Sequence, residues 1–280
     1  MSLSYSNLPV YVGEADGTSV TESSAYVAAT QANVSFAASA DAKRFLGSDV
    51  SSTDQFRVAG PLGVNISFSC FIDPFTADGF DFLATANQAD FFPIRIGGNL
   101  YKSCYLSEYS VSIEPYVPVA LSANFVSLTP FSGGEIVGDA TPYGGGVIPF
   151  DPDDIAYGHT CTLSNMTTVV GSVQSQINYK KQFSRTPIYT LGSTLATSML
   201  LDGVESEMSI TSTGLENLIS YSGDKLANKV QVNLKDVDGN SCVNITSVDM
   251  SAGARVLTEG YSVSAGDTLS TSATIKEINL

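Results

Sequence analysis

Histidine and tryptophan are nearly absent, since the chain has one histidine, His159, and no tryptophan. A Ser-His-Asp or Cys-His catalytic arrangement would need His159 as its base, with Cys161 two residues away. A catalytic base must be held on a rigid scaffold, whereas His159 lies in a segment with the composition of a linker. No nucleophile elbow accompanies it. The sequence therefore predicts no catalytic residue and no enzyme activity, and the lack of tryptophan argues against a sugar-binding site.

Motifs that hold phosphates or dinucleotides are also missing, because no Gly-rich loop ends in Lys-Ser or Lys-Thr and no dinucleotide fingerprint occurs. The residues from Asp236 to Asn240 imitate the start of a calcium loop, in which alternating oxygens converge on one ion. The sixth position is then Ser241, where that loop has Gly, and the twelfth is Ser247, where it has Glu. These departures favour a plain hairpin turn.

A second acidic group consists of Asp151, Asp153 and Asp154. It can bind a divalent cation only weakly, because nothing in the sequence fixes the geometry of its carboxylates. We therefore expect no cofactor and no metal site.

Basic residues are scarce: 13 Lys and Arg stand against 28 Asp and Glu, for a formal net charge of -15. No cluster of Lys and Arg offers the phosphate contacts that nucleic-acid binding needs. The acidic excess either serves solubility or creates a surface that must not hold a polyanion. Specific binding of nucleic acid is not expected under either interpretation.

The four cysteines, Cys70, Cys104, Cys161 and Cys242, show no CxxC spacing and would allow three pairings if oxidised. The first residues lack a basic patch followed by an apolar core, so they do not resemble a secretory signal. No apolar stretch is long enough to span a membrane. We therefore expect free buried thiols and assembly in the cytoplasm.

The composition that remains favours strands. Apolar residues make up 43% of the 280 residues and charged residues 15%, with 13 Tyr, 14 Phe and much Val, Thr and Ser. This length accommodates one large domain or two of ordinary size. The sequence predicts a mainly β chain with ample material for a core.

Two segments repeat one order of elements, which indicates duplication of a domain. Residues 63–70 alternate apolar and polar positions as a half-buried strand, and residues 203–210 keep that parity 140 residues later. A predicted helix cap follows each strand, at Asp73 and at Thr213. A short helix should follow each cap. The buried stripes of these helices would be Phe80, Leu83 and Ala84 in the first copy and Leu215, Leu218 and Ile219 in the second.

Each copy then continues with a hairpin and a closing strand. The first hairpin joins residues 92–96 to residues 103–113 through a Gly97-Gly98-Asn99 turn, and the second joins 230–234 to 241–250 through Asp238-Gly239-Asn240. Matching positions would be Ile94 with Val232, Ile96 with Leu234, and Cys104 with Cys242. The closing strands are 119–128 and 269–278, the second preceded by an insertion around residues 255–266.

Four segments follow from this pattern: an N-terminal arm (1–31), a first β domain (32–131), a linker (132–164) and a second β domain (165–280). The linker is rich in Gly and Pro, and between residues 132 and 160 it has five acids and no base. Such a segment is usually a solvated connector, and the alternative is a strap that packs on a neighbouring subunit.

The stretch from Tyr101 to Ile113, with Cys104-Tyr-Leu-Ser-Glu-Tyr-Ser-Val-Ser, continues from Pro118 to Val126. It resembles tail tube proteins and related virion proteins of tailed bacteriophages. In these proteins a strand of this type is followed by a turn and an Ala/Ser-rich strand. The strand from Gly63 to Ile72 and the helix expected after it fit that layout as well. The similarity covers nearly the whole chain by element order, and it carries over no functional residue.

The resemblance implies two tandem tail-tube-like β-sandwich or split-barrel domains, each with one short flanking helix. It implies a major tail tube protein whose strands join those of neighbouring subunits in stacked six-fold rings, so that two domains per chain would make a pseudo-hexameric ring from three chains. Its partners would be itself, other tail proteins and the genomic DNA that passes an acidic lumen without specific binding, with no membrane involved. The alternatives are a hub, completion or decoration protein of the virion and, from another class, a hydrolase or carbohydrate-binding module.

Overall fold

The computed structural model describes residues 10–16, 20, 26–27, 29–42, 56–72, 83, 91–96, 99–127, 155–165, 174–191, 196–213, 225–242, 247–262 and 270–279. The described chain is mainly β, and helix is confined there to Leu83. This confirms the mainly β fold class predicted from composition. The sheets are antiparallel and open, so the main sheet is not a closed barrel. Within these residues no helix has the length and apolar character needed to cross a membrane.

The strands in chain order are β1 (Val10–Val12), β2 (Tyr26–Val27), β3 (Ala29–Ala42), β4 (Phe56–Phe71), β5 (Phe92–Ile96), β6 (Asn99–Ile113), β7 (Ala120–Ser127), β8 (Thr162–Ser164), β9 (Gln174–Tyr189), β10 (Ala196–Thr213), β11 (Val230–Asn233), β12 (Ser247–Met250), β13 (Arg255–Ser262) and β14 (Ser270–Asn279).

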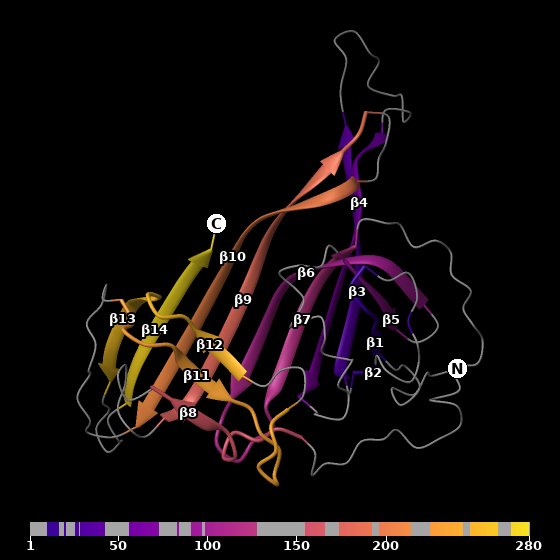
Figure 1. Ribbon diagram of the computed structural model, residues 1–280. Coiled ribbons are helices and arrows are strands. Elements are labelled where there is room, and N and C mark those ends of the chain that lie inside the picture. The colour runs from indigo at the N-terminus through magenta and orange to yellow at the C-terminus, as the bar shows by residue number, and fades with distance from the viewer. Residues whose placement is uncertain are drawn as a thin grey trace, which may run out of the picture.

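Eight strands cross the molecule as one continuous sheet in the order β3-β4-β7-β6-β9-β10-β14-β13 (Figure 1). Every neighbouring pair on this path is antiparallel. β6 is a branch point, because its first half pairs with β5 and its second half pairs with β9. β1 and β2 extend the branch beyond β5, and a separate sheet has the order β12-β11-β8.

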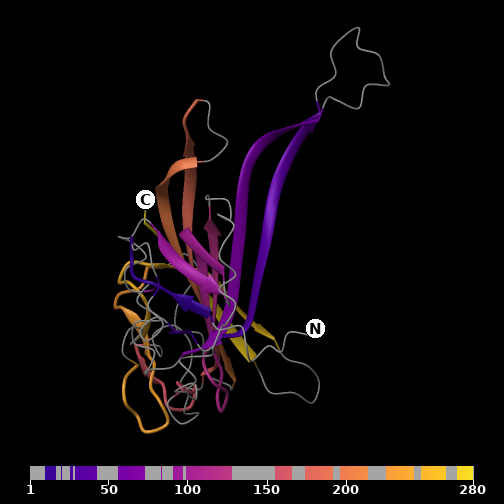
Figure 2. The ribbon, with the colours of Figure 1, turned by 90° about the vertical axis from the view of Figure 1, so that its right-hand side faces the viewer.

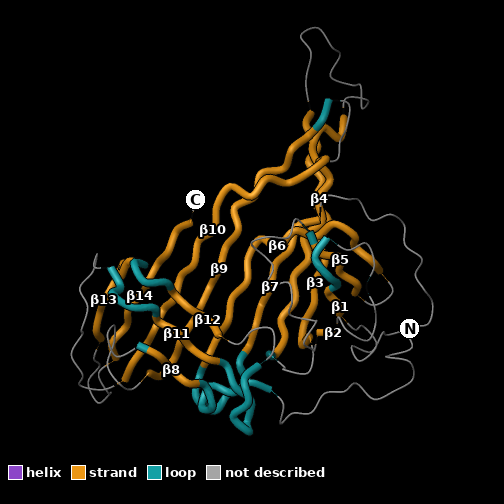
Figure 3. Tube along the Cα trace, viewed as in Figure 1, coloured by secondary structure: helices purple, strands orange, loops and turns teal. Residues whose placement is uncertain are grey.

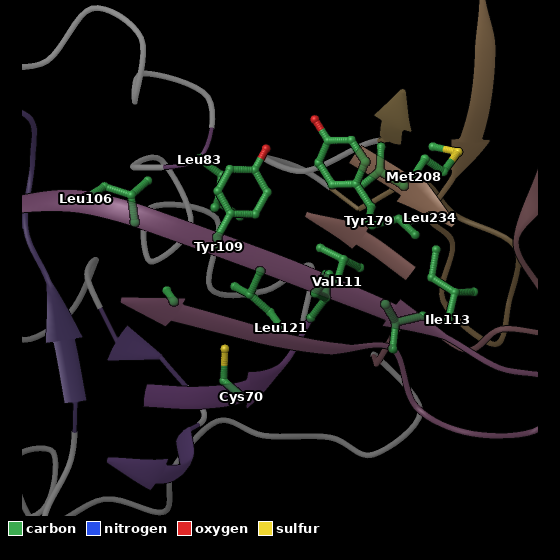
Figure 4. Packing of buried hydrophobic residues seen from close by; sticks show 14 of the residues in the cluster. Cys70, Leu83, Leu106, Tyr109, Val111, Ile113, Leu121, Tyr179, Met208 and Leu234 are labelled. Carbon is green, nitrogen blue, oxygen red and sulfur yellow. The ribbon is translucent and has the colours of Figure 1, made fainter. Parts of the chain in front are cut away.

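The core lies on one side of the eight-stranded sheet. The small sheet packs there against β10 and β14 through β12. Figure 4 shows Tyr109, Val111 and Leu121 from the middle of the long sheet beside Met208 and Leu234. One buried cluster therefore runs through both halves of the chain.

The two ends of the long sheet are built alike. We call β3, β4, β7 and β6 the first block, and β9, β10, β14 and β13 the second block. The opening strand of each block has a one-residue bulge near its start, at Thr30 in β3 and at Ser175 in β9. The pairing after each bulge proceeds in step, as in Val34 with Ile66 and Tyr179 with Met208.

The closing hairpins of the blocks also share one register. β6 bulges at Ser107 opposite β7, and β13 bulges at Leu257 opposite β14. Pairing then continues without interruption to the ends, which are Ser112 with Ala120 and Ser262 with Ser270. The two blocks therefore have the same strand order, and they share register and bulges between the bulge of the opening strand and the closing hairpin. Toward the hairpin tips the irregularities differ, lying between Ala38 and Ala40 in β3–β4 and at Asp202 and Thr197 in β9–β10.

Several sequence predictions need correction in register. The parity predicted for residues 63–70 and 203–210 is right. However, the equivalent of Ile66 is Met208 rather than Ser206. Ile66 faces Phe125 on β7, and Met208 faces Ile275 at the matching point of β14. The pattern alternates every two residues, so a shift of two leaves it unchanged and invisible in the sequence.

The second hairpin departs further from its prediction. Cys104 lies within β6, whereas Cys242 follows the turn after β11, so these cysteines are not equivalent. β12 covers only Ser247–Met250 of the strand predicted for 241–250. Residues 255–262, predicted as part of an insertion, are β13, the counterpart of the second half of β6. A turn at Gly253, with a φ of 94°, separates β12 from β13.

The described end of the predicted linker, residues 155–164, is packed against the rest of the chain. Ile155 and Ala156 are buried, and the Ala156 amide donates to the Ile72 carbonyl at 2.9 Å while its own carbonyl accepts from Val119. β8 then pairs with β11, so residues 155–164 are packed rather than solvated. Ile155 and Ala156 are an apolar pair directly after the acidic residues, and such side chains favour burial. These connections lie at the end of the sheet opposite the tips of the two long hairpins (Figure 3).

The predicted helices lie outside the described residues, apart from Leu83, which is buried. The same holds for Asp73, for the Gly97-Gly98 part of the first turn, and for residues 132–154 of the linker. Thr213, the second predicted cap, is the last residue of β10.

Candidate assembly surface

One face of the eight-stranded sheet is polar and carries short side chains. Alternation along the strands places Ile66, Leu121 and Ile210 in the core and sends their neighbours to the other face. The polar face includes Asn65, Ser67, Ser69, Ser110, Ser112, Ser122, Asn124, Asn178, Gln182, Ser209, Ser272 and Thr274. Its hydroxyls bridge strands, as in the 2.8 Å contact between Ser69 and Ser122.

The described charges in the middle of the polar face are mostly paired. The Lys180 ammonium lies 2.9 Å from a Glu108 carboxylate oxygen, and the Lys276 ammonium lies 2.8 Å from Glu205. Glu207 pairs with Lys180 in the strand register and therefore points to the same face. The two lysines are matched by carboxylates, so this part of the face presents no basic patch to solvent.

The blocks join where β6 meets β9, which we call the internal junction. Six residue pairs form it, from Glu108 with Gln182 to Ile113 with Ile177. On the polar face Glu108 accepts a hydrogen bond from Gln182 at 2.8 Å in addition to its ion pair with Lys180. The Ser112 hydroxyl donates a hydrogen bond to the Asn178 side chain at 2.9 Å, one of several side-chain interactions across the internal junction.

The core side of the internal junction is aromatic. The ring centroid of Tyr109 on β6 lies 6.0 Å from that of Tyr179 and 6.3 Å from that of Phe183, both on β9. Figure 4 shows the rings of Tyr109 and Tyr179 as neighbours. Burial raises the pKa of Tyr109 and Tyr179 above the usual tyrosine value, so both stay neutral. Burial lowers the pKa of Lys181, whose ammonium lies over the Phe183 ring at 5.7 Å. The junction therefore resembles a continuous domain core.

The outer edges of the two blocks stay open within the described residues. There β3 pairs only with β4, and β13 pairs with β14 apart from one isolated bridge between Arg255 and Lys225. Phe36 lies on β3, the edge strand of the first block, and is 65% exposed. Long open edges with apolar side chains favour pairing with another chain.

Two long hairpins project beyond the other strands at the same end of the sheet (Figure 2). One is β3–β4 and the other is β9–β10. Among the described residues of the β9–β10 hairpin, four large apolar ones are exposed near its tip: Ile188, Tyr189, Leu191 and Leu200. A cluster of this kind at a projecting tip is typical of a contact surface.

Two aromatic rings pack against His159. Its ring stacks on Tyr116 at 5.3 Å and lies 5.6 Å from the Tyr157 ring. The Cys161 thiol is in contact with the Tyr157 carbonyl at 3.2 Å, and burial raises its pKa, which disfavours the reactive thiolate. These contacts hold the turn that follows Ala156.

The predicted turn at Asp238-Gly239-Asn240 is confirmed, because Gly239 has a φ of 85°. Both Asp236 carboxylate oxygens accept hydrogen bonds from Asn240, at 2.7 and 2.9 Å. They are therefore used within the turn. No group of three or more potential metal ligands occurs in the described part of the chain, and Asp151, Asp153 and Asp154 lie outside it.

All four cysteines are free, as predicted. Cys70, Cys104 and Cys242 are buried and Cys161 is half-buried. Burial raises the pKa of Cys104 to about 12 and that of Cys70 further. These thiols act as small apolar residues of the core.

The sequence did not single out β9, which supplies half of the internal junction. The signal was present, because Ile177, Tyr179 and Phe183 alternate with polar residues, but Lys181 interrupts the pattern. A search for known relatives finds no protein-family model and no curated protein that matches this chain.

Proposed function

We propose that this chain is a structural virion protein, the major tail tube protein of a tailed bacteriophage, built from two tandem tail-tube-like β domains with one flanking helix each. The observation that carries the proposal is the match between the two blocks in strand order, register and bulge positions. Duplication of one domain explains why bulges recur at Thr30 and Ser175, and at Ser107 and Leu257.

The way the blocks are joined supports a ring. The internal junction continues the sheet from one block to the next, and it leaves β3 and β13 as open edges at the two ends. Repeating the same step between chains pairs these edges and closes the sheet. If one block is one sixth of a ring, three chains make a pseudo-hexameric ring.

The polar face suits the bore of such a ring. Its short hydroxyl and amide side chains offer DNA few groups to bind. Its lysines Lys180 and Lys276 form ion pairs with Glu108 and Glu205. A net charge of -15 keeps phosphates from binding, so genomic DNA passes without being held. The opposite face is the core, and it belongs on the outside of the tube with the small sheet.

The projecting hairpins suit contacts between stacked rings. Leu191 at the β9–β10 tip is fully exposed, with Leu200 nearby at 55% exposure. Burying such side chains against the next ring contributes about 1.5–3 kcal/mol each. Stacking of this kind gives a tube of indefinite length.

Imaging the purified chain by negative-stain electron microscopy over a range of concentrations tests the proposal. We expect stacked rings that grow into tubes with an open bore. Rings that never stack would favour a hub, completion or decoration protein of the virion. A chain that stays monomeric at high concentration would contradict the proposal, and a basic bore in the assembled particle would contradict the DNA-passage role.

A further inference from the structure

The internal junction provides a template for the contact between two copies of the chain. β6 and β9 are counterparts of β13 and β3, because each pair occupies the same place in its block. Counting from the bulges, Ser112 corresponds to Ser262 and Asn178 corresponds to Asn33. Each residue of the internal junction therefore has a defined equivalent on an open edge.

The equivalent residues keep the chemistry of the junction. Ser112 and Asn178 are hydrogen-bonded across the internal junction at 2.9 Å, and their equivalents are again a serine, Ser262, and an asparagine, Asn33. Asn33 is exposed on β3, so its side chain is accessible to a second chain. The same polar pair can form between copies.

The neighbouring apolar pair is kept with its two members exchanged. Val111 on β6 faces Tyr179 on β9, whereas the corresponding residues are Tyr261 on β13 and Val34 on β3. A Tyr and a Val would thus occupy facing positions in either case, and cross-strand pairs of an aromatic with a β-branched residue stabilise sheets. Because the exchange of Val and Tyr keeps the combined volume of the pair, it favours one contact used twice over two unrelated edges.

We infer that β13 of one chain pairs antiparallel with β3 of the next, in the register of the internal junction, with Ser262 opposite Asn33, Tyr261 opposite Val34 and Gly260 opposite Ser35. This inference rests on the proposed ring and names the surface through which it closes. In this register Phe36, which is 65% exposed in the single chain, would face Glu259 of the neighbour, as Tyr109 faces Lys181 in the internal junction.

Disulfide trapping tests the register directly. The double variant Ser262→Cys with Asn33→Cys should form covalent oligomers under mild oxidation, ending at a closed trimer on a non-reducing gel. A second double variant, Gly260→Cys with Ser35→Cys, should do the same, and position 260 has room because the nearest atom to an added Cβ is the Ser272 hydroxyl at 3.8 Å. Each single variant is the control for chance cross-linking.

Two matched variants calibrate the result. Ser112→Cys with Asn178→Cys places the same pair inside the chain, where it should form a disulfide without any oligomer. Ser262→Cys with Ser35→Cys is shifted by two residues, and its Cα atoms should lie about 7–8 Å apart, too far for a disulfide without movement of the backbone. We expect roughly tenfold less cross-linked product from the shifted pair than from the matched pairs.

The outcomes separate this inference from the tube proposal. Rings on the grid without a cross-link in either matched pair, or with more product from the shifted pair, would overturn the register while the tube stands. Cross-linked trimers from a chain that forms no tubes would support the register and contradict the tube. A monomeric chain without cross-links would contradict both.

Discussion

The hydroxyl of Ser112 on β6 donates a hydrogen bond to the side chain of Asn178 on β9 at 2.9 Å, across the line where two matching blocks of strands meet. This contact lies on the polar face of a sheet whose other face is aromatic at the same point. The two blocks thus interact through both faces of the sheet, and the contribution of each face to the free energy of unfolding can be measured separately.

The aromatic side of the internal junction should contribute most of its stability. Replacing Tyr179 by Ala removes a buried ring beside Tyr109 and should lower the free energy of unfolding by about 3–5 kcal/mol. Replacing Glu108 by Gln breaks a partly exposed ion pair with Lys180 and should cost about 0.2–1 kcal/mol. Urea unfolding curves of both variants compare the two sides. Equal losses would show that the polar side is as important as the aromatic side.

Gly158 should not tolerate a side chain. A Cβ at this position would overlap the backbone carbonyl of Glu114, which cannot move as a flexible side chain would. Gly158→Ala should therefore lower the free energy of unfolding by about 1–3 kcal/mol. Gly63→Ala is the control, because nothing lies within 4 Å of its added Cβ. Similar thermal midpoints for wild type and Gly158→Ala would contradict the packing of this turn.

The β9–β10 tip should be needed for tube growth and dispensable for folding. Leu191→Asp places a charge on a fully exposed apolar residue, and we expect single rings with few or no tubes. Val237→Asp alters another exposed apolar residue, 43% exposed and in the turn after β11, so its tubes should be normal. Length distributions from negative-stain images measure the effect. Normal tubes from Leu191→Asp would exclude this tip as the stacking contact.

The thiols should react in the order of their exposure. A thiol reagent at pH 8 should label half-buried Cys161 first, with Cys70, Cys104 and Cys242 reacting only as the chain unfolds. The raised pKa of Cys104, about 12, also has a consequence for stability. Between an unfolded pKa near 9 and this value only the unfolded chain loses the proton, so stability should fall as pH rises through that window. Rapid labelling of all four cysteines in the folded chain would contradict the buried assignment.

The strands that pair locally could be predicted from the sequence. Residues 92–96 are β5 as expected, and the closing strands β7 and β14 lie within about one residue of their predicted bounds. Alternation and a Gly-containing turn are local signals, so they can be recognised without knowing the fold.

The surface that joins the blocks could not be predicted in the same way. Pairing between Glu108 and Gln182 links distant residues, and no local pattern specifies which strands become neighbours. β13 was hidden because Gly253 breaks the strand before it and Gly260 interrupts its alternation. A period of two residues also leaves the register uncertain by two, which is the size of the shift at Met208.

The mass of the assembled particle tests the central claim most directly, because duplicated blocks halve the number of chains needed to close a six-block ring. Native mass spectrometry of the smallest ring should give three chains of 29.4 kDa, and its image should show six similar lobes around the bore. A ring of six chains would contradict the assignment of one block to one sixth of the ring. A particle that remains a single chain at every concentration would contradict ring assembly itself.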